Sequence, residues 1–313
     1  MLILAPMYDV TDVVFRQMVA ACAPPDMFMT EFVNVDGLQS AGRERLLHFL
    51  KREDTHDVPV IAQIWGKNPD NFYKTARELA NMGFDGIDLN TGCPDKTITK
   101  NGCCSAFIKP ENRPLFKDIL QATKNGAGDL PVSVKTRLGW GQTDFTWHQM
   151  VLEQGTTMFS IHGRTRKEMS KVPVRWYEIA HIRSMRDDIA PETKIIGNGD
   201  VMTVEQAHEL QEEHQLDGIM IGRGVFQDPY LFAGDASIWA NKTVAEKVDL
   251  FIKHLELYRD TYAVGERKYD PVKKFMKVYL SGFEGAADLR LQIATTKAPD
   301  EAITILERYK DSK

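Results

Sequence analysis

Short apolar runs alternate with amphipathic stretches along roughly the first 225 residues of the chain. Each run is short enough for a buried strand, and the stretches between the runs carry apolar residues at helical spacing, as in residues 71–82 and 204–215. The runs predict strands over residues 2–5, 27–32, 58–65, 86–90, 132–137, 158–162, 194–197 and 218–221. Eight strand–helix units in this length predict an α/β fold, a TIM (β/α)8 barrel of parallel strands.

A doubly wound parallel sheet is the main alternative for an alternating pattern of this kind. That fold binds dinucleotides through a GxGxxG turn after its first strand, and no such motif follows residues 2–5. The barrel is therefore the preferred interpretation.

The alternation ends after the eighth unit, and from Thr243 onward the pattern is helical. Thr243 and Glu246 have the spacing of a capping box at the start of a first helix. Pro271 and Pro299 are placed to open two further helices, which we expect to end near residues 279 and 309. A small helical domain is therefore expected to follow the barrel.

We accordingly divide the chain into a barrel domain, residues 1–242, and a helical domain, residues 243–313. The formal net charge of the whole chain is −5, which argues against indiscriminate nucleic-acid binding. Residues 242–313 carry 14 Lys and Arg against 12 Asp and Glu, whereas the preceding part carries 25 against 32. Any polyanionic partner should therefore favour the helical domain over most of the barrel.

A local basic stripe is present in the helical domain. Lys273, Lys274 and Lys277 fall at spacings that put at least two of them on one face of a helix. The stripe could contact the phosphates of a nucleic acid, or it could be only a solvated helix surface.

The composition is that of an ordinary globular protein, with 43% hydrophobic and 27% charged residues in 313. Residues 1–7 are too short an apolar segment for a signal peptide, and no run has the length of a membrane span, so we expect a cytoplasmic monomer without membrane contact. The four cysteines have neither a disulfide framework nor the spacing of zinc ligands, so no metal site is expected.

Residues that could do chemistry follow the predicted strands. Cys93 lies in a turn between Gly92 and Pro94, which should leave its thiol accessible at the end of a strand. Glycine turns follow strands seven and eight, where TIM barrels usually bind phosphate through backbone amides. The strand-end residues are Gln63, Asn90, Cys93, Lys135, Arg137, His162, Arg164, Asn198 and the turn over residues 222–224. Because the carboxyl ends of the strands meet at one end of a barrel, we expect one site that takes a phosphorylated ligand.

Each of these residues also has a purely structural interpretation. Cys93 could be a small buried hydrophobe, which is how the other three cysteines are interpreted. His162 alone fits a satisfied core histidine, and Gln63 and Asn198 could merely satisfy loop backbone. The convergence of a thiol, a lysine, a histidine and an anion cradle on one end of a barrel favours an active site.

Six motifs resemble those of the tRNA-dihydrouridine synthases. They are APM at residues 5–7, NxGCP at 90–94, VKTRLG at 134–139, HGRT at 162–165, GNGD at 197–200 and IGRG at 221–224. The resemblance spans the whole predicted barrel, and the helical C-terminal part agrees with it. The chain length and the continuation Leu138, Gly139, Trp140 are most similar to the bacterial C-type synthases, which act on uridine 16 of the tRNA D-loop.

The resemblance implies a flavin enzyme in which FMN lies in the barrel mouth, NADPH reduces it, and a uracil swung out of tRNA receives the hydride at C6. It makes Cys93 the general acid that protonates C5, a task for which a pKa near the ordinary value of about 8.5 is adequate. The implied cofactor-binding residues are Pro6, Met7, Tyr8, Gln63, Lys135, His162, Asn198, Gly199, Asp200, Gly222 and Arg223. The implied substrate-binding residues are Asn34, Asn90, Arg137, Lys273, Lys274 and Lys277, with Asn34 standing where C-type synthases more often have arginine.

Two other classes of protein fit parts of this pattern. A flavin oxidoreductase acting on a free small molecule, like the dihydroorotate dehydrogenases, would share the phosphate cradle but gives no reason for a basic helical domain. A non-catalytic RNA-binding barrel would need neither Cys93 nor Lys135. The resemblance therefore implies an NADPH-dependent flavin oxidoreductase that acts on tRNA, and these two classes stay as alternatives.

Overall fold

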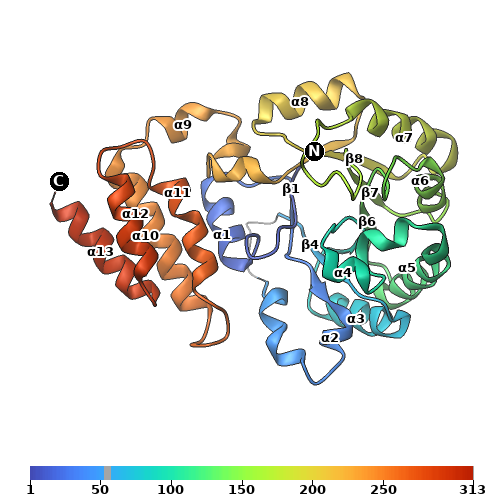
Figure 1. Cartoon of the computed structure of the whole chain (residues 1–313), viewed down its shortest axis with the longest axis horizontal. Helices are drawn as coiled ribbons and strands as arrows, with labels where there is room; N and C mark the ends of the chain where they lie inside the picture. Colours follow the sequence, from blue (N-terminus) through green and yellow to red (C-terminus); the bar gives the residue numbers. More distant parts are fainter. Residues whose placement is uncertain (53–57, 313) are drawn as a thin grey trace.

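A computed structural model describes residues 1–52 and 58–312 of the chain. Among these residues, eight parallel strands form a closed barrel, because β2 pairs with β1 on one side and with β4 on the other (Figure 1). The barrel strands are β1 (Leu2–Leu4), β2 (Met27–Met29), β4 (Val60–Trp65), β5 (Gly86–Asn90), β6 (Val132–Arg137), β7 (Met158–His162), β8 (Lys194–Asn198) and β9 (Gly218–Ile221). Each predicted run overlaps one of these strands, and the TIM barrel is confirmed.

The strand predicted over residues 27–32 is shorter in the structure. β2 ends at Met29, and a two-residue strand, β3 (Val33–Asn34), pairs with the end of β4. At the residue that follows β2, the hydroxyl of Thr30 accepts the backbone N–H of Gln63 at 3.0 Å and donates to the carbonyl of Glu31 at 2.8 Å. A side chain thus takes a donor that a continuous strand would pair with backbone.

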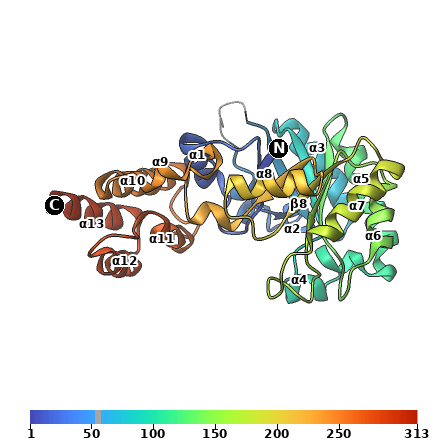
Figure 2. The ribbon, with the colours of Figure 1, turned by 90° about the horizontal axis from the view of Figure 1, so that it is seen from above.

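Helices follow the strands and surround the barrel (Figures 1 and 2). They are α1 (Val13–Cys22), α2 (Val35–Leu38), α3 (Pro69–Asn81), α4 (Lys96–Lys100), α5 (Arg113–Ala127), α6 (Phe145–Leu152), α7 (Trp176–Ile189) and α8 (Val204–Glu213). The helix predicted over residues 71–82 is α3, which begins two residues earlier because Asn68 caps it and Pro69 occupies its first turn. No helix in the described part of the chain is long and apolar enough to cross a membrane.

The chain after the barrel folds into a bundle, here called the helical lobe (residues 243–312). Its helices, with the short helix that precedes it, are α9 (Ala236–Ala240), α10 (Val244–Thr261), α11 (Met276–Tyr279), α12 (Ala286–Thr295) and α13 (Pro299–Asp311). The capping box of Thr243 and Glu246 is present. Pro271 opens a 3-10 segment (Asp270–Phe275) that leads into α11, where we expected one continuous helix. Residue 313, the last of the predicted helical domain, lies outside the described residues.

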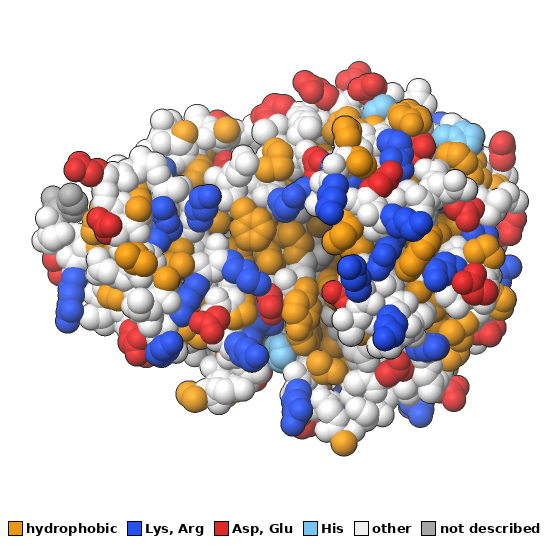
Figure 3. All heavy atoms as spheres, viewed as in Figure 1, with side chains coloured by type: hydrophobic (Ala, Val, Ile, Leu, Met, Phe, Trp, Pro, Cys, Tyr) orange, Lys and Arg blue, Asp and Glu red, His pale blue; other side chains and the backbone are white. Residues whose placement is uncertain are grey.

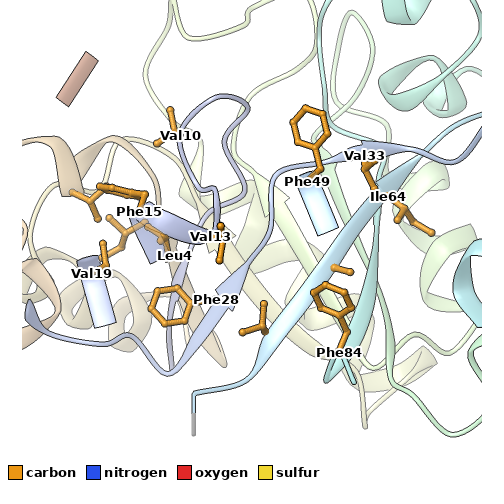
Figure 4. Packing of buried hydrophobic residues seen from close by; sticks show 14 of the residues in the cluster. Leu4, Val10, Val13, Phe15, Val19, Phe28, Val33, Phe49, Ile64 and Phe84 are labelled. Atoms are coloured by element: carbon orange, nitrogen blue, oxygen red, sulfur yellow. The ribbon is translucent and has the colours of Figure 1, made fainter. Parts of the chain in front are cut away.

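The helical lobe packs against the barrel beside α1, as Figures 1 and 2 both show. The ring of Phe15 in α1 stacks on Phe275 of the lobe, with ring centroids 4.6 Å apart. Leu4, Val19 and Phe28 belong to the same buried cluster (Figure 4), which continues from the barrel into α10 and α13. A single hydrophobic core therefore holds the lobe in a defined position relative to the barrel mouth.

Candidate active site

The predicted strand-end residues meet at one end of the barrel. Asn90 lies beside Lys135 in the strand register, and His162 lies between Arg137 and Asn198. Each of these residues is at or near the last position of its strand, so their side chains share the mouth of the barrel. The expected convergence is therefore present in the structure.

The turn that carries Cys93 is held from two sides. Oδ1 of Asn90 accepts the backbone N–H groups of Gly92 (3.1 Å) and Cys93 (2.9 Å). Nε of Arg137 donates to the carbonyl of Gly92 at 2.7 Å, and its Nη1 donates to the carbonyl of Met169 at 2.9 Å. Asn90 and Arg137, implied above as substrate contacts, thus bind the backbone around the thiol with these groups. Direct contact of either residue with a substrate stays a prediction.

The environment of the Cys93 thiol differs from what the sequence suggested. The buried Cys104 donates a side-chain hydrogen bond to Cys93 and thereby lowers the pKa of the Cys93 thiol to about 7. Burial raises the pKa of Cys104 well above its ordinary value, so Cys104 remains a thiol and a donor. Ser105 also binds this turn, donating its hydroxyl to the carbonyl of Cys93 at 2.7 Å. Cys104, interpreted from sequence as a packing residue, therefore also tunes the candidate acid; its spacing from Cys93 gave no signal of this.

Lys135 and His162 form the centre of the mouth. Nζ of Lys135 donates to Oδ1 of Asn198 at 3.1 Å, and Nδ2 of Asn198 donates to the carbonyl of Met220 at 2.8 Å. Burial lowers the pKa of Lys135 to about 8. Burial, together with the nearby charges of Arg137 and Lys135, holds the pKa of His162 well below its ordinary value. The imidazole is therefore neutral at pH 7.

The tautomer of His162 follows from its neighbour. Nη1 of Arg137 lies 3.5 Å from Nδ1 of His162, and a guanidinium can only donate. Nδ1 is therefore assigned as the acceptor, which leaves the proton on Nε2. A Cβ atom placed on Gly199 would lie 3.6 Å from Nε2, so this N–H is directed towards the glycine turn after β8.

The glycine turn after β8 allows a close approach of the backbone, and its role as an anion cradle, with the turn after β9, stays a prediction. Gly199 has φ +137°, and a Cβ there would approach Val174 to 2.8 Å, so glycine is required. The carboxylate of Asp200 pairs with both Arg164 and Arg223 and is thereby neutralised. Arg223 still has an exposed side chain at the mouth.

These features suit the phosphorylated flavin that the sequence implied. The ammonium of Lys135 makes one hydrogen bond within the described residues, which leaves donors for an anionic ring. His162 supplies a further N–H, and Gly222 leaves space beside Met7, whose sulfur would lie 3.5 Å from an added Cβ. In the described part of the chain, no three His, Cys, Asp or Glu side chains are grouped as metal ligands.

The family of the chain is decided by comparison with known proteins. The family model described as "Dihydrouridine synthase (Dus)" matches residues 3–313. The chain belongs to the dihydrouridine synthase family. This confirms the resemblance of the six motifs and the expectation of an NAD(P)H-dependent flavin oxidoreductase.

Curated relatives of this synthase chain carry matching names. A "Probable tRNA-dihydrouridine synthase" of Staphylococcus aureus is 43% identical over 98% of this chain and 92% of its own length. A "Probable tRNA-dihydrouridine synthase 2" of Bacillus subtilis is 42% identical over 98% of this chain and 93% of its own.

Solved structures share the barrel of this synthase at low sequence identity. Morphinone reductase superposes with a TM-score of 0.55 at 11% identity, covering 74% of this chain and 84% of that one. An old yellow enzyme homologue from Zymomonas mobilis gives 0.51 at 15% identity, covering 73% and 86%. These similarities support the fold.

The other residues that the resemblance implied lie around the mouth, and their side chains differ in exposure and in hydrogen bonding. Pro6, Met7 and Tyr8 follow β1, and the half-exposed ring of Tyr8 packs 5.7 Å from Phe32 and 5.6 Å from Phe49, between centroids. Asn34 caps α2, with its Oδ1 accepting the N–H of Gly37 at 2.6 Å. Gln63 is fully buried, and its amide is engaged at both ends, by Asp88 and Asn90.

The three lysines of the predicted basic stripe have different surroundings. Nζ of Lys273 turns into the helical lobe, donating to the carbonyls of Ala294 (3.3 Å) and Thr296 (2.6 Å) and to Asp270 (2.9 Å). Lys274 and Lys277 instead line a cavity of about 690 Å³ between the lobe and the barrel. Arg223, Phe226 and Met202 are on its other side. The stripe therefore reduces to two lysines that face the mouth.

Proposed function

We propose that this chain is a tRNA-dihydrouridine synthase that reduces a D-loop uridine, uridine 16, to 5,6-dihydrouridine, with FMN as cofactor and NADPH as reductant. The observation that carries the proposal is the placement of Cys93 at a barrel mouth that also holds Lys135, His162 and a glycine cradle. The alternatives of a small-molecule oxidoreductase and a non-catalytic barrel explain less, because neither uses both the thiol and the cationic cleft.

The residues that would hold FMN form two groups. The phosphate end would be held by Asn198, Gly199, Asp200, Gly222 and Arg223. The rest of the cofactor would contact Pro6, Met7, Tyr8, Gln63, Lys135 and His162. When bound, FMN supplies the two-electron chemistry of the reaction, with NADPH as the source of electrons. Lys135 offsets negative charge in this site, since its ammonium is near the mouth and retains free donors.

Cys93 transfers a proton to C5 of the uracil. A general acid works best when its pKa is near the working pH, and the Cys93 pKa of about 7 meets this condition. Loss of the proton leaves a thiolate, which the S–H of Cys104 stabilises by a hydrogen bond. Asn90 and Arg137 hold the backbone of the turn, so that the thiol is positioned before the substrate arrives.

Cations lie on both sides of the cleft that a tRNA would enter. Figure 3 shows Lys and Arg side chains around a hollow between the helical lobe and the barrel, with hydrophobic side chains inside it. Lys274 and Lys277 belong to the lobe side. On the barrel rim, Lys109 and Arg166 lie 4.4 and 4.6 Å from the ring centroid of Trp140. Helical domain and rim would thus contact phosphates on either side of an extruded nucleotide.

The assignment of the uridine that is reduced rests on residues 138–140. Trp140 of this segment holds Lys109 and Arg166 on the rim, so the part of the chain most similar to C-type synthases borders the surface that would bind RNA. This supports uridine 16. We also propose that the protein is a cytoplasmic monomer. Light scattering on the purified protein tests its mass.

The deciding experiment is to incubate the purified protein with FMN, NADPH and tRNA lacking dihydrouridine, and to measure dihydrouridine by nucleoside mass spectrometry. New dihydrouridine at position 16 is expected. Dihydrouridine at another position would retain the activity but reject the C-type assignment. A flavin that NADPH bleaches without any product would favour a small-molecule oxidoreductase, and a protein that binds tRNA but no flavin would favour the non-catalytic barrel.

A further inference from the structure

A chain of buried side-chain hydrogen bonds runs through the barrel to Cys93. Ser133, Asp88 and Gln63 are neighbours in the strand register of β6, β5 and β4. Ser133 Oγ donates to Oδ1 of Asp88 at 2.6 Å, and Nε2 of Gln63 donates to Oδ2 of Asp88 at 2.7 Å. Nδ2 of Asn90 then donates to Oε1 of Gln63 at 2.9 Å. This series of hydrogen bonds ends at the turn of Cys93, where Asn90 accepts the N–H groups of Gly92 and Cys93.

The direction of these hydrogen bonds is set from both ends, by the carboxylate of Asp88 and by the backbone N–H groups of Gly92 and Cys93. An ionised carboxylate accepts hydrogen bonds and cannot donate them, so Gln63 must turn its NH2 group towards Asp88. The carbonyl of Gln63 then faces Asn90, which must present its own NH2 group. Oδ1 of Asn90 is thereby left for the N–H groups of Gly92 and Cys93, which are both donors.

Without the carboxylate, the amides of Gln63 and Asn90 could take the opposite orientation. In that orientation an NH2 group of Asn90 would face the N–H groups of Gly92 and Cys93, and two hydrogen bonds to the turn would be lost. Asp88 and Gln63 are fully buried and Asn90 is 8% exposed, so water could not replace these bonds. The carboxylate of Asp88 therefore reinforces the orientation that holds the turn of Cys93, although Asp88 does not touch the thiol.

A buried carboxylate is a costly way to hold two neutral side chains. Lys135 of β6 is the cation that acts on Asp88, and Ser133 and Gln63 are its hydrogen-bond partners. A neutral amide of the same shape would avoid the cost of burying a charge but would not fix the orientation of Gln63. This contrast favours a role in orientation over one in packing.

We propose that Asp88 is a positioning residue for Cys93, acting through the amides of Gln63 and Asn90 to hold the turn of residues 90–93 in its reactive form. The proposal rests on the proposed role of Cys93. It is tested by a property of the thiol that requires neither flavin nor tRNA.

The test compares the single variants Asp88→Asn and Gln63→Glu with the double variant that contains both. Asp88→Asn sets an amide against the amide of Gln63 and removes the carboxylate that fixes the direction at this end. The double variant exchanges the two groups, so that the new amide at position 88 would donate to the new carboxylate at position 63. That carboxylate can only accept, so Asn90 must again present its NH2 group and keep Oδ1 for the turn. Ser133→Ala is the matched control, because it removes one hydrogen bond to the same carboxylate without changing the direction.

The readout is the rate at which iodoacetamide alkylates Cys93 in the flavin-free protein, followed by peptide mass spectrometry as a function of pH. We expect Asp88→Asn to shift the midpoint of this profile and to slow uridine reduction by about tenfold or more, since misplacing a reacting group by about 1 Å can cost up to about 10²-fold. The double variant should return the midpoint to that of the wild type, and Ser133→Ala should leave it near the wild type.

Two results would overturn the proposal: a wild-type alkylation profile in folded Asp88→Asn, or a double variant as displaced as the single one. Circular dichroism and thermal melting identify variants that fail to fold, and the Gln63→Glu variant alone, which should also shift the midpoint, then decides. If even the wild type forms no dihydrouridine, the proposed function fails, but the alkylation profiles still decide whether Asp88 positions the thiol.

Discussion

The barrel mouth and the helical lobe both carry polar residues that sequence patterns single out, yet the two regions use them differently. In the mouth, side chains from β4 to β8 converge on one site. In the lobe, one lysine of a three-lysine stripe is turned inward. Arg267, which precedes this stripe in the sequence, has a side chain that is only 4% exposed. A position at a strand end dictates where a side chain points. A position in the lobe does not, because its helices meet at angles that local sequence does not set.

The largest effect should come from Cys93, because the mouth carries the chemistry. Cys93→Ala should lower uridine reduction by about 10² to 10⁴-fold, the usual contribution of a general acid. Flavin binding and NADPH oxidation should persist, as spectra and stopped-flow bleaching can show. Cys22→Ala, at the end of α1, is the control and should reduce tRNA normally. Full product formation by the Cys93 variant would remove the assigned role.

The next largest effect concerns the contact between the two regions. Arg267 pairs with Glu31 at 2.8 Å and with Asp12 at 3.4 Å, and Glu31 is 1% exposed. Arg267→Met leaves buried carboxylates without their cation and should lower the free energy of unfolding by about 3–5 kcal/mol. Urea unfolding measures this. Arg259→Met, which breaks the exposed pairs with Asp260 and Asp300, should have a much smaller effect.

This loss of stability should depend on pH. Burial raises the pKa of Glu31 to about 7, above its ordinary value of 4.5, despite the opposing effect of Arg267. The folded protein therefore holds the proton of Glu31 more tightly than the unfolded chain, and the stability this provides is present below pH 4.5 and lost as pH rises through 7. Without the guanidinium the ionised form costs more, so the effect of Arg267→Met on stability should be larger at about pH 8 than at about pH 5. An equal effect at both values would contradict this assignment.

A smaller effect separates the lysines of the stripe. Lys274→Glu with Lys277→Glu should weaken tRNA binding and lower the slope of log affinity against log salt by about 1 for each phosphate that is no longer neutralised. NADPH oxidation without RNA should remain normal. Lys273→Met should instead cost about 1–3 kcal/mol of stability, because it removes hydrogen bonds from a charged group to two carbonyls. Unchanged tRNA affinity in the double reversal would reject the lobe as an RNA surface.

The smallest effect lies within the mouth. Cys104→Ala removes the donor that lowers the pKa of Cys93, so this pKa should rise from about 7 towards 9. Alkylation of Cys93 should then need higher pH, and uridine reduction should persist to higher pH before the acid is deprotonated. Cys103→Ala is the matched control, since the side-chain hydrogen bond to Cys93 comes from Cys104. A coincident pH profile for Cys104→Ala would reject the tuning role.

Much of the fold follows from sequence because strand and helix periods are local properties. The runs at residues 86–90, 132–137, 158–162 and 218–221 coincide with β5, β6, β7 and β9. Where the prediction and the structure differ, the cause is a feature that the hydrophobic pattern does not contain. α12 begins at Ala286 after Gly285, which has φ +85° and provides no side-chain cap, so this helix lacks the signal that identified α10. The strand expected over residues 27–32 ends at Met29. The hydroxyl of the next residue, Thr30, binds a residue of the next barrel strand.

The sequence by itself determined that this protein is a parallel barrel with a thiol, a lysine and a histidine at its strand ends, because alternation and turn residues act over a few positions. Only the tertiary structure decided which of those groups remain free and how they are tuned. Asn90 is oriented by Gln63, 27 positions away, and Lys273 is captured by Thr296, 23 positions away. A buried polar group must find a partner, and that partner is supplied by whichever distant segment packing brings beside it.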